Sequence, residues 1–364
     1  MWEFKYKELE FKWLGIGLYN RFCYGLFTLG STLVVDRFTF NWWYLLNFDF
    51  ISDNLKLKYG QVDGIDELII GLIFIVLSII FFLFKKKYEL WYKTKYPCNL
   101  IAIKQQGLQA NSFPDFNKKI AGKDFRNSII HPILINEIDL DKNKEYQKAL
   151  TNQDSIISDI LNLKDSLINH ELAYWGITRI PLAYRLGVKL SDTQTIYVFD
   201  YNRESQKWNQ LSYSWLKNKI IRPKKFTINT SNIFNNSSQN LIISISTTFN
   251  VSIDECLKVV PNYYKFYNLF LFNIGNGKRD RFKTISEINL LSEQYRKLMD
   301  EISTDSNIKT IHLFYAGPNS LAFKFGSVYS ESIHPNIIVY NYNRNDNPCY
   351  SWGYNVSKNM IVGS

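Results

Sequence analysis

One segment of this chain occurs twice, and this repeat constrains the fold more than any other feature. The first copy, AYWGITRIPLAYRLG, ends at Gly187, and the second, HLFYAGPNSLAFKFG, ends at Gly326. A further pair follows in the same order: residues 196–203 read IYVFDYNR and residues 337–344 read IIVYNYNR. Two similar blocks in the same order and at nearly equal offsets predict a structural unit that is built twice.

Apolar runs typical of strands alternate with segments typical of helices throughout the part that contains the repeat. Two segments, Ile156–Ile168 and Ile288–Ile302, carry apolar residues at helical spacing. Most of the strand candidates are short and apolar on both faces, which favours a parallel sheet covered by helices. The candidates are Leu100–Lys104, Ile129–Ile138, Glu171–Ile177, Thr195–Tyr201, Leu241–Ser246, Asn268–Ile274, Thr310–Ala316 and Asn336–Tyr342.

The repeat and the alternation together predict an α/β fold made of two fused Rossmann-like halves with mostly parallel sheets. The first half is expected over residues 96–215 and the second over residues 241–364, with a polar, basic linker at 216–240. Ligands of such sheets bind beyond the carboxyl ends of the strands. Two similar halves that face one another suit a ligand with repeating units.

Residues 1–95 have a different character, with many aromatic residues and a long apolar run. Leu68 to Phe84 is uncharged over 17 residues, and three lysines follow it directly. A membrane helix at about 67–84 is expected, with a buried core helix as the alternative. A weaker span at about 13–35 completes a predicted membrane helical hairpin, with an external aromatic loop between the two helices. The lysine bias places both termini and the large α/β part on the cytoplasmic side.

Two polar residues, Asn20 and Arg21, fall within the weaker span. A charge inside a membrane span usually faces water or protein, so these residues are candidates for lining a pore made by several copies. The alternative is that Arg21 lies near the cytoplasmic end and extends to the lipid interface.

The composition argues against metal and cofactor chemistry. The four cysteines form no CxxC pair, and the four histidines are far apart in the sequence and lack ligand spacing. No P-loop, HExxH or GxSxG motif is found, so no catalytic residues, metal or cofactor are expected. The formal charge of +10 suggests an anionic partner, either lipid head groups or a nucleotide. The alternative is that lysine is simply abundant in this chain.

The second block carries a resemblance to a known family. IHLFYAGPNSLAFKFGSVY, followed by PNIIVYNYNRNDNPCYSW, resembles the C-terminal part of SAVED domains, which are fusions of two CRISPR-associated Rossmann-like (CARF) halves. This resemblance implies a cyclic-oligonucleotide sensor, an effector of bacterial anti-phage signalling of the CBASS type. It further implies a cyclic di- or trinucleotide as ligand, ligand-induced homo-oligomers and a location at the bacterial inner membrane. DNA is not an expected partner. The first block departs from the pattern, because Arg179-Ile180-Pro181 replaces Gly317-Pro318-Asn319.

Candidate ligand-binding residues follow from their positions at predicted strand ends. Cations there would pair with phosphates, aromatic rings would stack on bases, and the turn after a strand offers backbone N–H groups. The alternative for an aromatic residue at a strand end is a place in the core. The alternative for the Gly275–Arg279 turn is an ordinary solvated turn. The candidates are Arg179, Arg203, Lys278, Arg279, Arg344, Gly317, Pro318, Asn319, Tyr201, Tyr342, Trp208 and Trp352.

Three functions are compatible with the sequence. The first is a membrane-anchored effector that binds a cyclic oligonucleotide, oligomerises and disrupts the inner membrane, which gives abortive anti-phage defence. The second is a membrane-tethered phosphodiesterase that degrades the nucleotide. The third is a nucleotide-sensing scaffold that recruits a separate effector.

Overall fold

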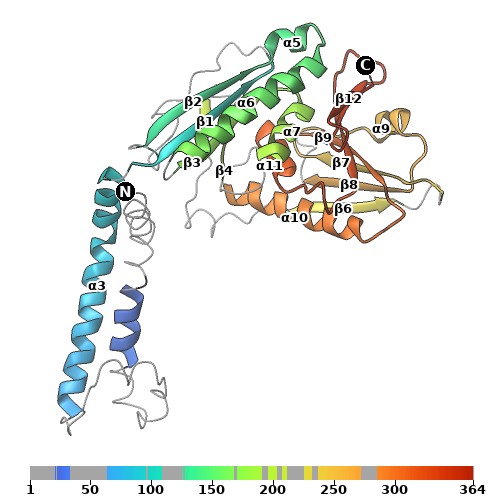
Figure 1. Ribbon diagram of the computed structural model, residues 1–364. Helices are drawn as coiled ribbons and strands as arrows, with labels where there is room; N and C mark the ends of the chain where they lie inside the picture. Colours follow the sequence, from blue (N-terminus) through green and yellow to red (C-terminus); the bar gives the residue numbers. More distant parts are fainter. Residues whose placement is uncertain are drawn as a thin grey trace. The chain divides into compact units, whose positions relative to one another are not determined.

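The chain of 364 residues forms two compact units, residues 1–97 and residues 98–364. The computed structural model describes residues 21, 23–32, 64–95, 97–108, 125, 128–167, 170–190, 196–202, 207–210, 225–231, 237–271 and 285–363. Figure 1 shows the elements along the chain. Each unit is described below by itself.

The first unit contains two helices that pack closely. Residues 23–32 are helical, and α3 runs from Gly64 to Lys95. The hydroxyl of Ser78 donates a hydrogen bond to the carbonyl oxygen of Cys23 at 3.0 Å. A Cβ at Gly30 would lie 2.8 Å from the carbonyl oxygen of Gly71, so only glycine allows this approach.

The described residues contain no helix that is both long enough and apolar enough to cross a bilayer. The predicted span at about 67–84 is therefore wrong, and with it the membrane helical hairpin and the inner-membrane location that depended on it. Part of the other predicted span, at about 13–35, lies outside the described residues. The physical reason is length, because a 17-residue apolar run extends only about 25 Å as a helix, against a hydrocarbon core of roughly 30 Å. α3 exceeds that run only by including charged residues at its ends.

Of the two residues predicted to line a pore, the structure describes only Arg21. Arg21 is helical and exposed, and Asn20 lies outside the described residues. Lipid as a partner, which the formal charge of +10 also suggested, stays a prediction.

The first half of the second unit is built on a five-stranded sheet of order β2-β1-β3-β4-β5. The first four of these strands pair in parallel, and β5 pairs with β4 in antiparallel register. Its strands are β1 (Asn99–Gln106), β2 (Ile129–Asn136), β3 (His170–Ile177), β4 (Ile196–Asn202) and β5 (Lys207–Gln210). Its helices are α5 (Ile138–Lys142), α6 (Tyr146–Ser166) and α7 (Ile180–Leu190).

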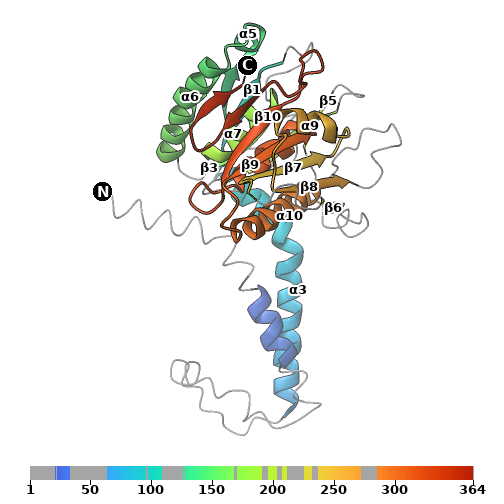
Figure 2. The ribbon, with the colours of Figure 1, turned by 90° about the vertical axis from the view of Figure 1, so that its right-hand side faces the viewer.

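The second half is built on a seven-stranded sheet of order β12-β11-β10-β9-β7-β8-β6, which Figure 2 shows. The four strands β8, β7, β9 and β10 are parallel, and the others are antiparallel to their neighbours. Its strands are β6 (Phe226–Ser231), β7 (Asn240–Ser246), β8 (Lys265–Leu271), β9 (Thr310–Ala316), β10 (Asn336–Asn341), β11 (Trp352–Asn355) and β12 (Met360–Val362). Its helices are α9 (Ile253–Val259), α10 (Ile285–Ser303) and α11 (Asn319–Ser327).

The two sheets share one topology. The order β2-β1-β3-β4-β5 in the first half matches β8-β7-β9-β10-β11 in the second, and the latter is extended by β6 and β12 at its edges. The repeat in the sequence is therefore a repeat of structure. β6 lies within the stretch 216–240 that the sequence suggested as a linker.

The repeated helices α7 and α11 cross one another between the two sheets. Each packs on the sheet of the opposite half, α7 on β10 and β11, and α11 on β3 and β4. A Cβ at Gly187 would lie 2.0 Å from the carbonyl oxygen of Phe323, and a Cβ at Gly326 would lie 2.0 Å from that of Tyr184. The pair of glycines that ends the two repeat copies thus allows the backbones of the two helices to touch.

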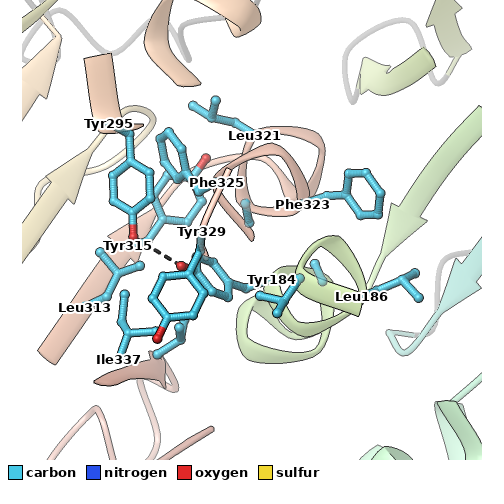
Figure 3. Close-up of a cluster of buried hydrophobic side chains, with 14 of the residues drawn as sticks. Tyr184, Leu186, Tyr295, Leu313, Tyr315, Leu321, Phe323, Phe325, Tyr329 and Ile337 are labelled. Atoms are coloured by element: carbon cyan, nitrogen blue, oxygen red, sulfur yellow. Dashed lines mark hydrogen bonds between the residues drawn. The ribbon is translucent and has the colours of Figure 1, made fainter. Parts of the chain in front are cut away.

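One hydrophobic core spans both halves around this crossing (Figure 3). The hydroxyl groups of Tyr184 on α7 and Tyr295 on α10 lie 3.2 Å apart and share a hydrogen bond. The ring of Phe323 stacks on Tyr174 of β3, with centroids 4.1 Å apart. Burial of these large rings across the boundary holds the two halves together as one body.

Candidate functional site

Each half contains a topological switch point, where the connections that follow two neighbouring parallel strands lead to opposite sides of the sheet. Rossmann-like sheets bind ligands at such points. The two points lie at the carboxyl ends of β1 and β3 and of β7 and β9. The strand ends are joined in the same way in both halves. Gly107 N–H donates to the Ile177 carbonyl oxygen at 2.9 Å, and Thr247 N–H donates to that of Ala316 at 2.9 Å.

A glycine faces a threonine at both points, but the two residues exchange places. A Cβ at Gly107 would lie 2.3 Å from Oγ1 of Thr178, and a Cβ at Gly317 would lie 2.0 Å from Oγ1 of Thr247. The glycine follows β1 in the first half and β9 in the second. The two edges are therefore alike in backbone but different in the side chains that they present.

The first turn of α11 meets the first half directly. Asn319 donates from Nδ2 to the carbonyl oxygen of Thr178 at 2.8 Å. Pro318 is the N-cap residue, and no side chain caps the helix. The carbonyl oxygen of Pro318 accepts a hydrogen bond from the hydroxyl of Tyr315 at 3.0 Å. The hydrogen bond from Asn319 to Thr178 brings the carboxyl edges of β3 and β9 together at the boundary of the halves.

The second residue of α11 adds an unsatisfied hydroxyl to this turn. Ser320 is 2% exposed, and its Oγ has no hydrogen-bond partner among the residues that the structure describes. The equivalent position in the first repeat copy is Pro181, which has neither a hydroxyl nor an N–H group. The start of α11 is thus richer in unused hydrogen-bonding groups than the start of α7.

A buried carboxylate, Glu137, lies beneath the edge of the first half. Its oxygens accept hydrogen bonds from the hydroxyl of Thr178 at 2.6 Å and from Nε2 of Gln153 at 2.6 Å. Gln105 at the end of β1 donates to the same carboxylate at 3.2 Å. Burial raises the pKa of Glu137 above its ordinary value, although these hydrogen bonds act to lower it.

The polar network continues from Glu137 into the second half through Arg185. This fully buried guanidinium donates to Oε1 of Gln153 at 2.9 Å and to Asp154 at 2.5 Å. It also donates twice, at 3.1 Å, to Oδ1 of Asn359 in the turn between β11 and β12. A chain of hydrogen bonds therefore connects the edge residue Thr178 with the C-terminal hairpin.

Two further predicted ligand residues, besides Asn319, have protein partners. The Arg179 guanidinium binds both carboxylate oxygens of Asp141, at 2.6 and 3.0 Å. Burial alone would lower the pKa of Arg179, but this hydrogen-bonded carboxylate raises it. Trp352 is buried and stacks on Tyr146, with centroids 3.9 Å apart.

The remaining candidates that the structure describes lie at or after the ends of strands. Gly317, Pro318 and Asn319 lie together in the turn between β9 and α11. Tyr342 and Arg344 are exposed in the loop that follows β10. The backbones of Tyr201 and Trp208 pair directly between β4 and β5. Three cations, Arg203, Lys278 and Arg279, lie outside the described residues.

Sequence reasoning did not select Glu137, Thr178 or Arg185, although they form the network beneath the edge. Glu137 was included in a predicted strand that extended to Ile138, whereas β2 ends at Asn136. An acidic residue directly after an apolar strand was the available signal. Among the described residues there is no cluster of three or more His, Cys, Asp or Glu side chains that would hold a metal ion.

The fold defines the larger unit as two Rossmann-like halves that share one core and place their carboxyl edges together. A family model named SAVED, described as "SMODS-associated and fused to various effectors sensor domain", matches residues 157–356, which is more than half of the chain. The chain belongs to this family, and the resemblance of its C-terminal block to SAVED domains is confirmed. A search among curated proteins found no match.

Solved structures of SAVED/CARF-domain receptors are similar at low sequence identity. The Acinetobacter baumannii Cap4 receptor with 2′3′3′-cAAA has a TM-score of 0.45 and 11% identity, with 83% of this chain and 67% of that chain covered. The same receptor with 3′3′3′-cAAA gives 0.45 and 13%, with coverage of 83% and 68%. The Moraxella osloensis Cap4 receptor gives 0.42 and 14%, with coverage of 81% and 61%. The chain thus spans about two thirds of the length of these receptors.

Proposed function

We propose that this chain senses a cyclic oligonucleotide, which binds across the carboxyl edges of the two halves near the first turns of α7 and α11. The observation that carries the proposal is the contact between Asn319 and Thr178, because it brings two equivalent strand edges together in a member of a sensor family. A ring of repeated nucleotides matches two repeated edges. The uncapped start of α11 offers N–H groups to an anion.

The proposal is tested by thermal melting of the full chain with 2′3′3′-cAAA, 3′3′3′-cAAA and a panel of cyclic dinucleotides. A ligand at a hundredfold excess over its dissociation constant stabilises the folded state by about 2.7 kcal/mol, so binding is expected to raise the Tm by several degrees. Absence of a shift with every compound would contradict the proposal.

A matched pair of arginine variants locates the binding edge. Arg344 is exposed in the loop after β10, whereas Arg296 is exposed on α10 and pairs with Glu293. Arg344→Ala is expected to weaken binding of the active compound, since it removes a cation from the proposed edge. Arg296→Ala is expected to leave the affinity unchanged. Equal losses in both variants would indicate only a general charge effect.

We further propose that ligand binding drives self-association and that the chain acts as the sensor of an anti-phage effector. The family description, a sensor fused to various effectors, supports this role. Light scattering of the full chain should show a higher mass after addition of the active compound. A mass that stays constant at saturating ligand would reject ligand-driven assembly.

Binding without turnover is part of the same proposal. Chromatography of the ligand after long incubation with the full chain is expected to recover it intact. Loss of the ring would instead support the phosphodiesterase alternative.

A further inference from the structure

The side-chain amide of Asn319 has only one orientation that satisfies its neighbour. The Thr178 carbonyl oxygen, 2.8 Å away, can accept a hydrogen bond but cannot donate one. The amide nitrogen must therefore face Thr178, and Oδ1 must point to the other side. Asn319 is half-buried, and no group in the described part of the chain donates to this oxygen. The result is an acceptor that is held in a fixed direction by the opposite half.

The first half has no counterpart to this acceptor. The structure pairs Thr178 after β3 with Gly317 after β9, one residue away from the comparison of the two turns made from the sequence. In this alignment Ile180 occupies the position of Asn319, and an isoleucine side chain forms no hydrogen bonds. The residue before it, Arg179, is already engaged by Asp141. The starts of α7 and α11 are thus chemically different, although their backbones are related by the repeat. A symmetric ring bound across both would meet a directional acceptor at one end only.

The chemistry of Oδ1 decides which part of a nucleotide it can take. A phosphate oxygen is also an acceptor and is repelled by it, whereas the exocyclic amino groups of bases are donors. Asparagine often recognises adenine with its oxygen and nitrogen together. In this chain the nitrogen is bound to Thr178, so one acceptor remains to recognise one N–H group.

We propose that Asn319 determines base specificity, because its Oδ1 accepts a hydrogen bond from the exocyclic amino group of one base of the bound ring. This inference rests on the proposed function, since it assumes that a cyclic oligonucleotide binds at this edge. The base at the start of α7 is bound without a side-chain hydrogen bond from Ile180. Specificity is therefore asymmetric between the two repeated edges.

The test compares matched pairs of ligands on the full chain by calorimetry. Each pair consists of a cyclic trinucleotide and its analogue without the exocyclic amine. The first pair is 3′3′3′-cAAA and the same ring with unsubstituted purine in place of each adenine. The second pair is the ring of three guanosines and the ring of three inosines. We expect the wild-type chain to favour the amine-bearing member of one pair by roughly 2- to 12-fold, the range for one neutral hydrogen bond.

Two variants at the same position separate recognition from folding. Asn319→Ala removes both the bond to Thr178 and the acceptor, and it is expected to bind both members of the pair equally. Asn319→Asp also removes the donor to Thr178 but keeps an oxygen acceptor, so it is expected to retain a preference for the amine. Asn307→Ala, at an exposed asparagine in the turn before β9 and so away from the carboxyl edge, serves as the control with an unchanged preference.

The outcomes are distinct. If Asn319→Ala weakens both ligands but keeps the wild-type preference, Asn319 only joins the halves and the inference is overturned. If the wild-type chain binds both members of each pair equally, no exocyclic amine is recognised and the inference is also overturned. If no ring binds the wild-type chain, the proposed function fails together with the inference.

Discussion

Gly187 lies against the carbonyl oxygen of Phe323, at a distance that would leave an added Cβ only 2.0 Å from that oxygen. The second repeat copy makes the equivalent contact, in which Gly326 lies against the carbonyl oxygen of Tyr184. The two copies of the repeat are therefore complementary to each other. Each supplies the glycine that the other needs, and the crossing of α7 and α11 joins the halves into one core.

Gly187→Ala is expected to destabilise the chain strongly. The added methyl group meets backbone rather than a flexible side chain, so the helices must separate, and overpacking of this kind costs typically 1–3 kcal/mol or more. Gly25→Ala is the matched control, because this helical glycine has nothing within 4 Å of an added Cβ. That substitution should be neutral or slightly stabilising. Urea denaturation of both variants checks the prediction, which fails if Gly187→Ala unfolds at the wild-type midpoint.

Asn359→Gly is expected to loosen the C-terminal hairpin. Asn359 has a φ of 46°, which glycine adopts without strain, so this substitution removes only the side chain. It takes away the oxygen that accepts from Arg185 and from the Tyr354 hydroxyl at 3.0 Å. Hydrogen bonds to charged groups contribute about 1.5–3 kcal/mol, so a loss near 2 kcal/mol is expected in denaturant titrations.

Asn359→Asp provides the comparison, because it keeps the oxygen and adds a negative charge beside the buried guanidinium of Arg185. Stability close to that of the wild type is expected. If Asp and Gly are equally destabilising, the backbone conformation rather than the hydrogen bonds holds this turn.

The sequence predicted the parallel strands well because each is a short run that is apolar on both faces. Such a run, as in Leu241–Ser246, can be predicted as a strand from its own sequence, without knowledge of the strand that it pairs with. The strands it missed, β5, β6, β11 and β12, are short and pair in antiparallel register at the sheet edges. β5, β6 and β11 carry polar residues that resemble loop sequence, and β12 has only three residues. The membrane helices were predicted from apolar character, and the run of 17 residues was too short to support them.

The candidate site was predictable where the repeat reached it and not beyond. Gly317, Pro318 and Asn319 stood out because the two blocks could be compared. The partners of Asn319 and Arg185 were hidden, since Thr178 and Asn359 lie 141 and 174 residues away in the sequence. Single polar residues at strand ends carry no pattern that pairs them. Their contacts arise only when both sheets have formed.

His312 is expected to lower the stability of the chain in acid. Burial lowers the pKa of this β9 histidine to about 4, from an ordinary value of 6.5. Its stabilising effect is complete above pH 6.5, where the unfolded form is also neutral, and is lost as the pH falls toward 4. The loss amounts to about 3 kcal/mol at most. Thermal melting of His312→Phe and the wild type between pH 4 and 8 measures it: the wild type should lose stability relative to the variant as the pH falls.

Glu137 is expected to produce a pH dependence of opposite sign. Burial raises the pKa of this carboxyl above its ordinary 4.5, so the native state holds a proton that the unfolded state releases. The stabilising contribution of Glu137 is complete below pH 4.5 and is lost as the pH rises through the folded pKa. Glu137→Gln does not titrate, and its amide can donate to the hydroxyl of Thr178, which then accepts.

The difference in Tm between the wild type and Glu137→Gln, measured from pH 4 to 8, should therefore shift in favour of the variant as the pH rises. A difference that stays constant would mean that the hydrogen bonds from the three neighbouring side chains offset the effect of burial on the pKa of Glu137. Because Thr178 joins Glu137 to Asn319, the same titration should also change the affinity for the ligand. In Glu137→Gln that pH dependence of the affinity should disappear. A variant at His312, which lies on β9 in the second half, should retain it.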